Sequence, residues 1–250
     1  MTAKRRSRLT LTRSRVIVGV LLDVGGTLWP ERGLANETAE RMSRLIATFP
    51  AITRAQARGF LEQFSVRAPL AERGLTQDVI QVLDQASKAA GLELSHSQLQ
   101  EARRALCVPA AGHFQLFAGA EALLRTIRRL GLGCALVSNA SVRTGGDYRR
   151  DFAGFGLADA IDVCVSSVDV GIRKPDPRIF AAALDALRCE AAQAVVVGNS
   201  EPNDIEPARR LGAHAIRVAI EEPLPVSSSA DAVVTSLASV AEILGRSVRG

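Results

Sequence analysis

Four segments of the chain place polar side chains where an apolar run ends or a helix begins. In chain order these side chains are Asp23 and Thr27, Ser138 and Asn139, Lys174, and Asn199 and Asp204. They supply an acid, a hydroxyl, an ammonium group and an amide followed by a second acid. If one fold brings them together, they form a polar site with the groups needed for catalysis.

Each of these side chains also has an ordinary structural explanation. Asp23 precedes Gly25 and suits a turn, and Ser138 with Asn139 suits a helix cap. Lys174 suits the surface, and Asp204 suits the first turn of a helix, where the dipole favours an acid. It is harder to explain all four segments as caps when each one lies at a strand end or a helix start. The sequence therefore predicts that they form one functional site.

The elements that must position these residues follow an alternating pattern. Apolar runs at 134–138, 161–166, 194–198 and 215–220 alternate with helical patterns near 148–155, 177–188 and 203–211. This alternation predicts a doubly wound, Rossmann-like α/β core with a parallel sheet. The run VIVGVLL (16–22) fits its first strand, apolar throughout because both faces are buried. Right-handed crossovers then bring the polar strand ends to one edge.

An inserted segment of different character separates the first strand from the others. Four amphipathic helical patterns follow cap signals at Asn36, Thr53, Thr76 and Ser95, and Thr53 and Ser95 have Gln three residues later, as in a capping box. We therefore expect a core formed by 16–33 and 115–250, with a four-helix cap domain at 34–114. Such an insertion is best placed over the C-terminal edge of the sheet, where open α/β sheets bind ligands.

The net charge of +5 lies in the N-terminal tail. Residues 1–15 hold six basic side chains and no acid, so the rest of the chain is close to neutral. We expect a disordered basic tail and no nucleic-acid partner beyond weak tail contacts. The apolar run after the tail is too short for a membrane span and lacks a cleavage site. The four cysteines show no regular spacing, which favours a cytoplasmic protein with no membrane partner.

The segments DVGGTL, LVSNAS, RKPDPRIF and VGNSEPND together resemble the four motifs of the haloacid dehalogenase-like hydrolase superfamily. The resemblance runs in the right order from residue 16 onward, and the insertion sits where that superfamily carries its helical cap. It implies a hydrolase with Asp23 as the nucleophile, which forms a covalent aspartyl intermediate that water then hydrolyses. Ser138 and Lys174 would hold the phosphoryl oxygens.

The resemblance also implies a Mg²⁺ ion. It would be bound by Asp23, the backbone carbonyl of Gly25 and Asn199, with Asp204 supporting these ligands. Thr27 and Asn139 would lie against the substrate. Trp29, at the hinge into the cap, would line the substrate pocket or pack at the domain junction.

Two positions depart from the superfamily's phosphatases. Those enzymes usually carry an aspartate where this chain has Gly25, and that residue protonates the leaving alcohol and later activates water. They also usually carry an aspartate where this chain has Asn199. A positioned acid–base group is worth about 10²–10⁴-fold in rate, so Gly25 predicts slow turnover or a restriction to good leaving groups. Asn199 predicts weaker metal binding because an amide brings no charge.

Three functions remain open at this stage. The first is a Mg²⁺-dependent phosphatase, a monomer or homodimer, acting on a small phosphorylated metabolite. The second is a metal-independent 2-haloacid dehalogenase, which needs no second acid because a halide leaves without a proton; Arg54 and Arg58 would bind the halide or carboxylate, or lie solvated on their helix. The third is a non-catalytic descendant that binds a phosphate ligand.

Overall fold

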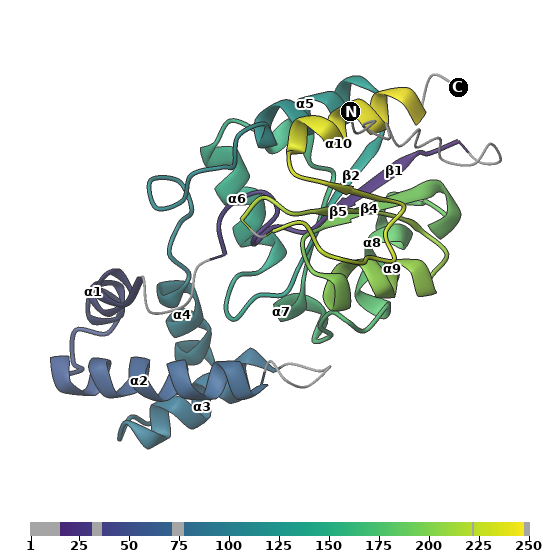
Figure 1. Cartoon of the computed structure of the whole chain (residues 1–250). Coiled ribbons are helices and arrows are strands. Elements are labelled where there is room, and N and C mark those ends of the chain that lie inside the picture. The colour runs from purple at the N-terminus through teal and green to yellow at the C-terminus, as the bar shows by residue number, and fades with distance from the viewer. Residues whose placement is uncertain (1–15, 32–36, 72–77, 222, 248–250) are drawn as a thin grey trace.

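A six-stranded parallel sheet forms the centre of the computed structural model, which describes residues 16–31, 37–71, 78–221 and 223–247 (Figure 1). The strand order is β3-β2-β1-β4-β5-β6. The strands are β1 Gly19–Leu22, β2 Gly133–Ser138, β3 Val163–Ser166, β4 Ala194–Gly198, β5 His214–Val218 and β6 Ala232–Val234. The order reverses direction at β1, so the doubly wound sheet predicted from the sequence is confirmed and its ligand-binding switch point lies between β1 and β4.

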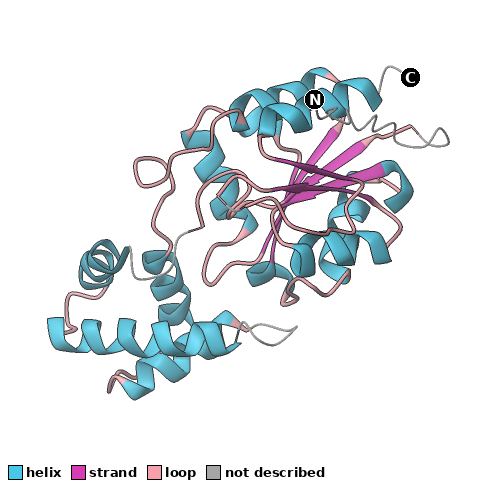
Figure 2. Cartoon of the chain, viewed as in Figure 1, coloured by secondary structure: helices cyan, strands magenta, loops and turns pink. Residues whose placement is uncertain are grey.

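Helices cover both faces of the sheet (Figure 2). One face carries α5 (Ala120–Arg129), α6 (Gly145–Gly154) and α10 (Leu237–Ser247), and the other carries α8 (Arg178–Leu187) and α9 (Glu206–Arg210). Short elements complete the core: α7 (Ser167–Val170), 3₁₀ turns at Ala158–Ala160 and Ala191–Gln193, and a π-turn at Glu201–Ile205. None of the described helices combines the length and apolarity that a membrane crossing requires.

β1 is buried on both faces, as its composition predicts. Leu21 packs with the cluster beneath α8, whereas Val20 and Leu22 pack with the cluster beneath α5 and α10. The strand is shorter than the apolar run, however. Val16 and Val18 lie before it and are exposed, whereas Ile17 between them is buried. The paired register with β2 and β4 begins at Gly19.

The four-helix segment comprises α1 (Thr38–Thr48), α2 (Arg54–Ala71), α3 (Val79–Ala89) and α4 (His96–Leu106). It packs around its own apolar cluster, in which Phe60, Phe64, Leu45 and Leu83 are almost fully buried. In Figure 1 it lies apart from the helices of the core, on the side toward which β1 runs.

The helix caps of this segment match the sequence in part. Both capping boxes form, at Thr53 with Gln56 and at Ser95 with Gln98. The N-cap of α3 is Asp78, whose carboxylate accepts from two backbone amides, and not Thr76. Thr76 and Asn36, like the basic tail at 1–15, lie outside the described residues.

A buried ion pair fastens the four-helix segment to the core. Arg103 of α4 donates to Asp147 of α6 at 2.6 Å and to the carbonyl of Val142 at 2.6 Å. The side chains of Arg103 and Asp147 are 9% and 4% exposed, whereas Arg150, which also pairs with Asp147, is 71% exposed. Hydrogen bonds from Thr144 outweigh burial and hold the pKa of Asp147 below its usual value.

We expect Arg103→Met to destabilise the fold by about 3 kcal/mol, because it removes one partner of a buried pair and leaves the Val142 carbonyl without its donor. Arg150→Met removes an exposed partner of the same carboxylate and should cost less than about 1 kcal/mol. Urea denaturation of both variants measures the difference. Equal losses would show that Arg103 does not fasten the two parts.

Candidate active site

The ammonium group of Lys174 joins two carboxylates at the C-terminal edge of the sheet. Its Nζ lies 2.5 Å from Asp23 Oδ1 and 2.7 Å from Asp204 Oδ1, and it also donates to the Val137 carbonyl at 3.2 Å. The side chains of Lys174, Asp23 and Asp204 are all less than a tenth exposed. The structure therefore brings together residues that are far apart in sequence, at the edge where the strand pattern placed them.

The sheet delivers Asp23 to the switch point. Asp23 follows β1 directly, and its amide donates to the Val197 carbonyl of β4 at 2.9 Å. On β4 the next residue, Gly198, approaches Asp204 so closely that a Cβ there would lie 2.4 Å from the Asp204 carboxyl carbon. Asp204 Oδ2 accepts from the Ser200 amide at 3.0 Å. Gly198 is thus what allows Asp204 to turn back beneath the strand end.

The charges in this centre support one another. Burial opposes a charge on Lys174, but Asp204 and Asp23 outweigh it and raise the pKa of the Lys174 ammonium above its usual value. Burial, assisted by the charge of Asp23, raises the pKa of Asp204, and the Lys174 ammonium opposes this shift. Lys174 therefore stays protonated at neutral pH, and the centre carries a cation between two acids.

Lys174 is held by its backbone as well as by its side chain. The sequence suggested that it begins a helix directly after β3, but α7 comes first and Lys174 lies in the loop between α7 and α8. Asn139 accepts from the Lys174 amide at 2.8 Å and donates to its carbonyl at 3.0 Å. Asn139 thus positions Lys174 in this structure, and its predicted contact with substrate stays a prediction.

Thr27 lies between Asp23 and Asn199. Its hydroxyl donates to Asp23 Oδ2 at 2.8 Å and lies 3.5 Å from Asn199 Oδ1. The turn that carries it closes through Gly26, whose amide donates to the Trp29 carbonyl at 2.8 Å. Gly26 has a φ of +73°, and a Cβ on it would lie 2.3 Å from Asn199 Nδ2. The turn therefore requires a glycine at position 26.

Gly25 sits in different surroundings. It does not have a positive φ, and within the described part of the chain, its two neighbours aside, a Cβ added to it would meet the Cγ of Glu31, at 4.0 Å. The backbone at position 25 therefore suits a residue with a side chain, and its Cβ would clash with no described residue. The described residues therefore do not require a glycine at position 25, in contrast to position 26.

Ser138 connects the centre to an aromatic cluster. Its hydroxyl lies 2.7 Å from the hydroxyl of Tyr148 on α6. Burial raises the pKa of Tyr148 to about 12, so this phenol is neutral at physiological pH. Trp29 stacks near Phe114, Tyr148 and Phe152 at centroid distances of 5.2, 6.0 and 5.4 Å, and is 4% exposed. The packing interpretation of Trp29 accounts for this position.

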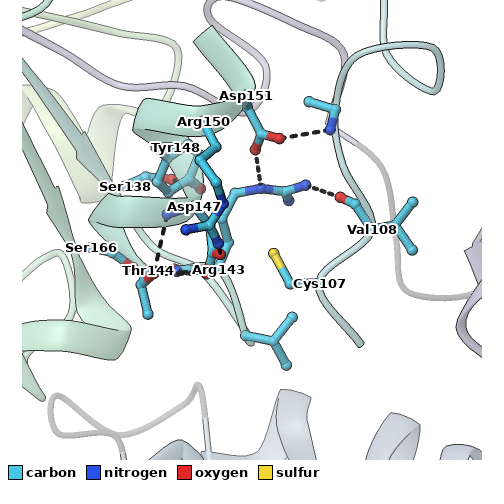
Figure 3. A network of polar contacts seen from close by, with 12 residues as sticks. Cys107, Val108, Ser138, Arg143, Thr144, Asp147, Tyr148, Arg150, Asp151 and Ser166 are labelled. Atoms are coloured by element: carbon cyan, nitrogen blue, oxygen red, sulfur yellow. Dashed lines mark hydrogen bonds and ion pairs between the residues drawn. The ribbon is translucent and has the colours of Figure 1, made fainter. Parts of the chain in front are cut away.

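Arg143 extends this cluster toward the four-helix segment. Its guanidinium carbon lies 5.9 Å from the centre of the Trp29 ring. Figure 3 shows its side chain between Asp151 and Val108, to which it donates. Val108 belongs to the stretch that returns from α4, so Arg143 lies at the junction of the two parts. Sequence reasoning did not single out Arg143 or Tyr148, because an arginine and a tyrosine near a helix start are common on surfaces.

The two predicted cap arginines do not join the centre. Arg54 and Arg58 are exposed in the first turns of α2, and Figure 1 shows that the chain enters α2 at the end remote from the sheet. In this structure Arg54 and Arg58 lie in solvent on the surface of α2.

Oxygen donors that suit a hard cation lie beside Asp23. Asp23 Oδ2 and Asn199 Oδ1 both face the Thr27 hydroxyl, while Asp204 uses both oxygens within the protein. The described residues contain no group of three or more His, Cys, Asp or Glu arranged for a metal. One carboxylate and an amide nevertheless fit Mg²⁺, which keeps several waters and needs only one or two carboxylates. These ligands would hold Mg²⁺ weakly, because Asn199 contributes no charge.

The fold and this centre define a class: doubly wound α/β proteins with an acid after the first strand and a lysine facing it. A family model for haloacid dehalogenase-like hydrolases matches residues 17–212. The chain therefore belongs to the haloacid dehalogenase-like hydrolase family, as its motifs indicated.

Individual relatives carry two kinds of name. A bovine (Bos taurus) haloacid dehalogenase-like hydrolase domain-containing protein 3 is 40% identical over 44% of this chain and 43% of its own length, so the match spans less than half of that relative. A phosphoserine phosphatase of Thermus thermophilus is 35% identical over 50% of this chain and 46% of its own length. A plasmid-encoded phosphoglycolate phosphatase of Cupriavidus necator is 28% identical over 93% of this chain and 95% of its own.

Solved structures confirm the fold. A phosphatase of this family from Thermococcus onnurineus superimposes with a TM-score of 0.62 at 23% identity, covering 92% of this chain and 98% of its own. A 2-haloacid dehalogenase from Pseudomonas syringae does so with a TM-score of 0.59 at 20% identity, covering 92% and 99%. Both kinds of enzyme share this architecture, so the fold does not choose between them.

The two adjacent glycines predict different outcomes on substitution. Gly26→Ala should destabilise the protein by about 1–2 kcal/mol, because its left-handed conformation penalises a Cβ and Asn199 must move. Gly25→Ala should change stability by less than about 0.5 kcal/mol. Denaturant midpoints measure both. A Gly26→Ala variant as stable as the wild type would contradict the described turn.

Proposed function

We propose that this protein is a Mg²⁺-dependent phosphatase that hydrolyses a small phosphorylated metabolite in the cytoplasm through Asp23. The observation that carries the proposal is the Asp23 carboxylate, held at the switch point by Lys174 at 2.5 Å and Thr27 at 2.8 Å. The relatives named as phosphatases support the same reaction class. In this proposal the four-helix segment is a cap that excludes water from the bound substrate.

The first step is an in-line displacement at phosphorus. An Asp23 oxygen attacks the phosphorus atom, and the bond to the leaving oxygen breaks. Lys174 stabilises the negative charge on the transferring oxygens, because its ammonium is desolvated and fixed by Asp204. In the second step, water attacks the phosphorus of the aspartyl phosphate and restores the Asp23 carboxylate.

Ser138 binds a phosphoryl oxygen in this mechanism. Ser138 Oγ donates to the Asn139 carbonyl at 3.3 Å, so the Tyr148 hydroxyl, at 2.7 Å, can donate to Ser138 Oγ. Bound substrate would take the serine proton from this longer bond. The neutral phenol of Tyr148 keeps this donor in place at physiological pH.

Mg²⁺ would be held by Asp23, Asn199 and the Gly25 carbonyl, with Asp204 behind them. When bound, the ion supplies positive charge that neutralises the phosphoryl oxygens. The amide of Asn199 makes this binding weaker than a second carboxylate would.

We expect Asp23→Asn to lower phosphate release from 4-nitrophenyl phosphate by at least about 10⁴-fold, because the nucleophile is lost. Asp185→Asn changes an exposed acid on α8 and should leave the rate unchanged. EDTA should lower the wild-type rate, and added Mg²⁺ should restore it.

The same samples, given a 2-haloacid, test the second candidate function. Gly25 is the observation that favours it, since a halide needs no proton to leave. Halide release that resists EDTA, with no phosphate release, would overturn the phosphatase proposal. If neither phosphate nor halide is released, the result would favour a non-catalytic phosphate-binding protein.

A further inference from the structure

The side chain of Glu31 lies in front of Gly25. Among the residues that the structure describes, and apart from its chain neighbours, the heavy atom that a Cβ built on Gly25 would meet is the Cγ of Glu31, at 4.0 Å. The tight turn after β1 produces this approach. Gly25 and Trp29 form a backbone bridge, closed by the bond from the Gly26 amide to the Trp29 carbonyl. Two residues after Trp29, the chain presents the exposed Glu31 to the same space.

Standard bond lengths place the carboxyl group of Glu31 near the position of the missing acid. The carboxyl oxygens of an aspartate at position 25 would lie about 2.4 Å from its Cβ, and those of Glu31 lie about 2.4 Å from its Cγ, by standard geometry. Because these two centres are only 4.0 Å apart, the regions that the two carboxyl groups can reach overlap. The position of the Glu31 Cγ therefore places its carboxyl group within one side-chain bond of this region.

The site otherwise lacks a group suited to proton transfer among the described residues. Asp23 is the nucleophile, and Asp204 is tied to Lys174 and the Ser200 amide. Tyr148 has a pKa of about 12, so it rarely ionises near neutral pH. An alkoxide leaving group needs a proton, and the attacking water must lose one.

We propose that Glu31 is the general acid and base of this site and replaces the aspartate that Gly25 lacks. The inference rests on the proposed phosphatase function. In the first step the protonated Glu31 gives its proton to the leaving oxygen as the phosphorus–oxygen bond breaks. In the second step the Glu31 carboxylate takes a proton from the water that attacks the aspartyl phosphate. One proton leaves and one returns, so Glu31 ends each cycle as it began.

The test measures the first turnover of Glu31→Gln in rapid-mixing experiments with Mg²⁺ present. With 4-nitrophenyl phosphate, whose leaving group needs little protonation, the first turnover should slow less than tenfold. This first turnover should appear as a burst of 4-nitrophenol followed by a slower steady rate, because loss of the base slows hydrolysis of the aspartyl phosphate. With ethyl phosphate the first turnover should slow by about 10²–10³-fold. A merely structural role would not produce this dependence on the leaving group.

Rescue and control variants complete the experiment. Gly25→Asp in the Glu31→Gln background should recover at least tenfold of the lost rate on ethyl phosphate, since it returns a carboxyl group to a position where a Cβ clashes with no described residue. Glu62→Gln removes an exposed acid on α2 and should match the wild type. Equal effects of Glu31→Gln on both substrates, or no effect, would overturn the role of Glu31 while leaving the phosphatase proposal intact. A wild-type protein inactive on both phosphates would overturn both proposals.

Discussion

The buried contact of Lys174 with Asp23 and Asp204 is the interaction on which the rest of the site depends. Each of these charges would be costly to bury alone, and an ammonium between two carboxylates offsets much of that cost. The contact can form only if β1, β4 and the loop before α8 meet within hydrogen-bond distance. The strand order places β1 beside β4, so the sheet topology and the ionic centre require each other.

This constraint extends to the backbone around the centre. Gly198 must lack a side chain because Asp204 packs against it, and Gly26 must lack one because Asn199 does. Asn139 fixes the backbone of Lys174 from the end of β2. In the sequence Gly26, Gly198 and Asn139 look like ordinary turn residues. In the structure each one allows or fixes the position of a side chain in the centre.

Sequence reasoning predicted the parallel core because apolar runs separated by helical patterns have few other solutions. It also predicted which polar residues gather, since the C-terminal ends of parallel strands share an edge. It could not predict the surroundings of single side chains. Whether Trp29 lines a pocket or stacks with Phe114 and Phe152 depends on tertiary packing. The exposure of Arg54 and Arg58 likewise depends on which end of α2 faces the core, and helical periodicity does not specify that.

Gly25 has a second consequence besides the missing proton donor. In the family's usual phosphatase pattern, aspartates at positions 25 and 199 would add two negative charges beside Asp23, and a divalent ion would be needed to make room for a phosphoryl anion. Here the centre holds two carboxylates and one ammonium, so an incoming anion meets less repulsion. Glu31 lies on the exposed surface beside Gly25, whereas an aspartate at position 25 would be attached to the turn that carries Asp23 and Thr27. Asp23 and its cation are thus buried and held in place by their contacts, and under the proposed mechanism proton transfer falls to Glu31, on the exposed stretch that leads toward the four-helix segment.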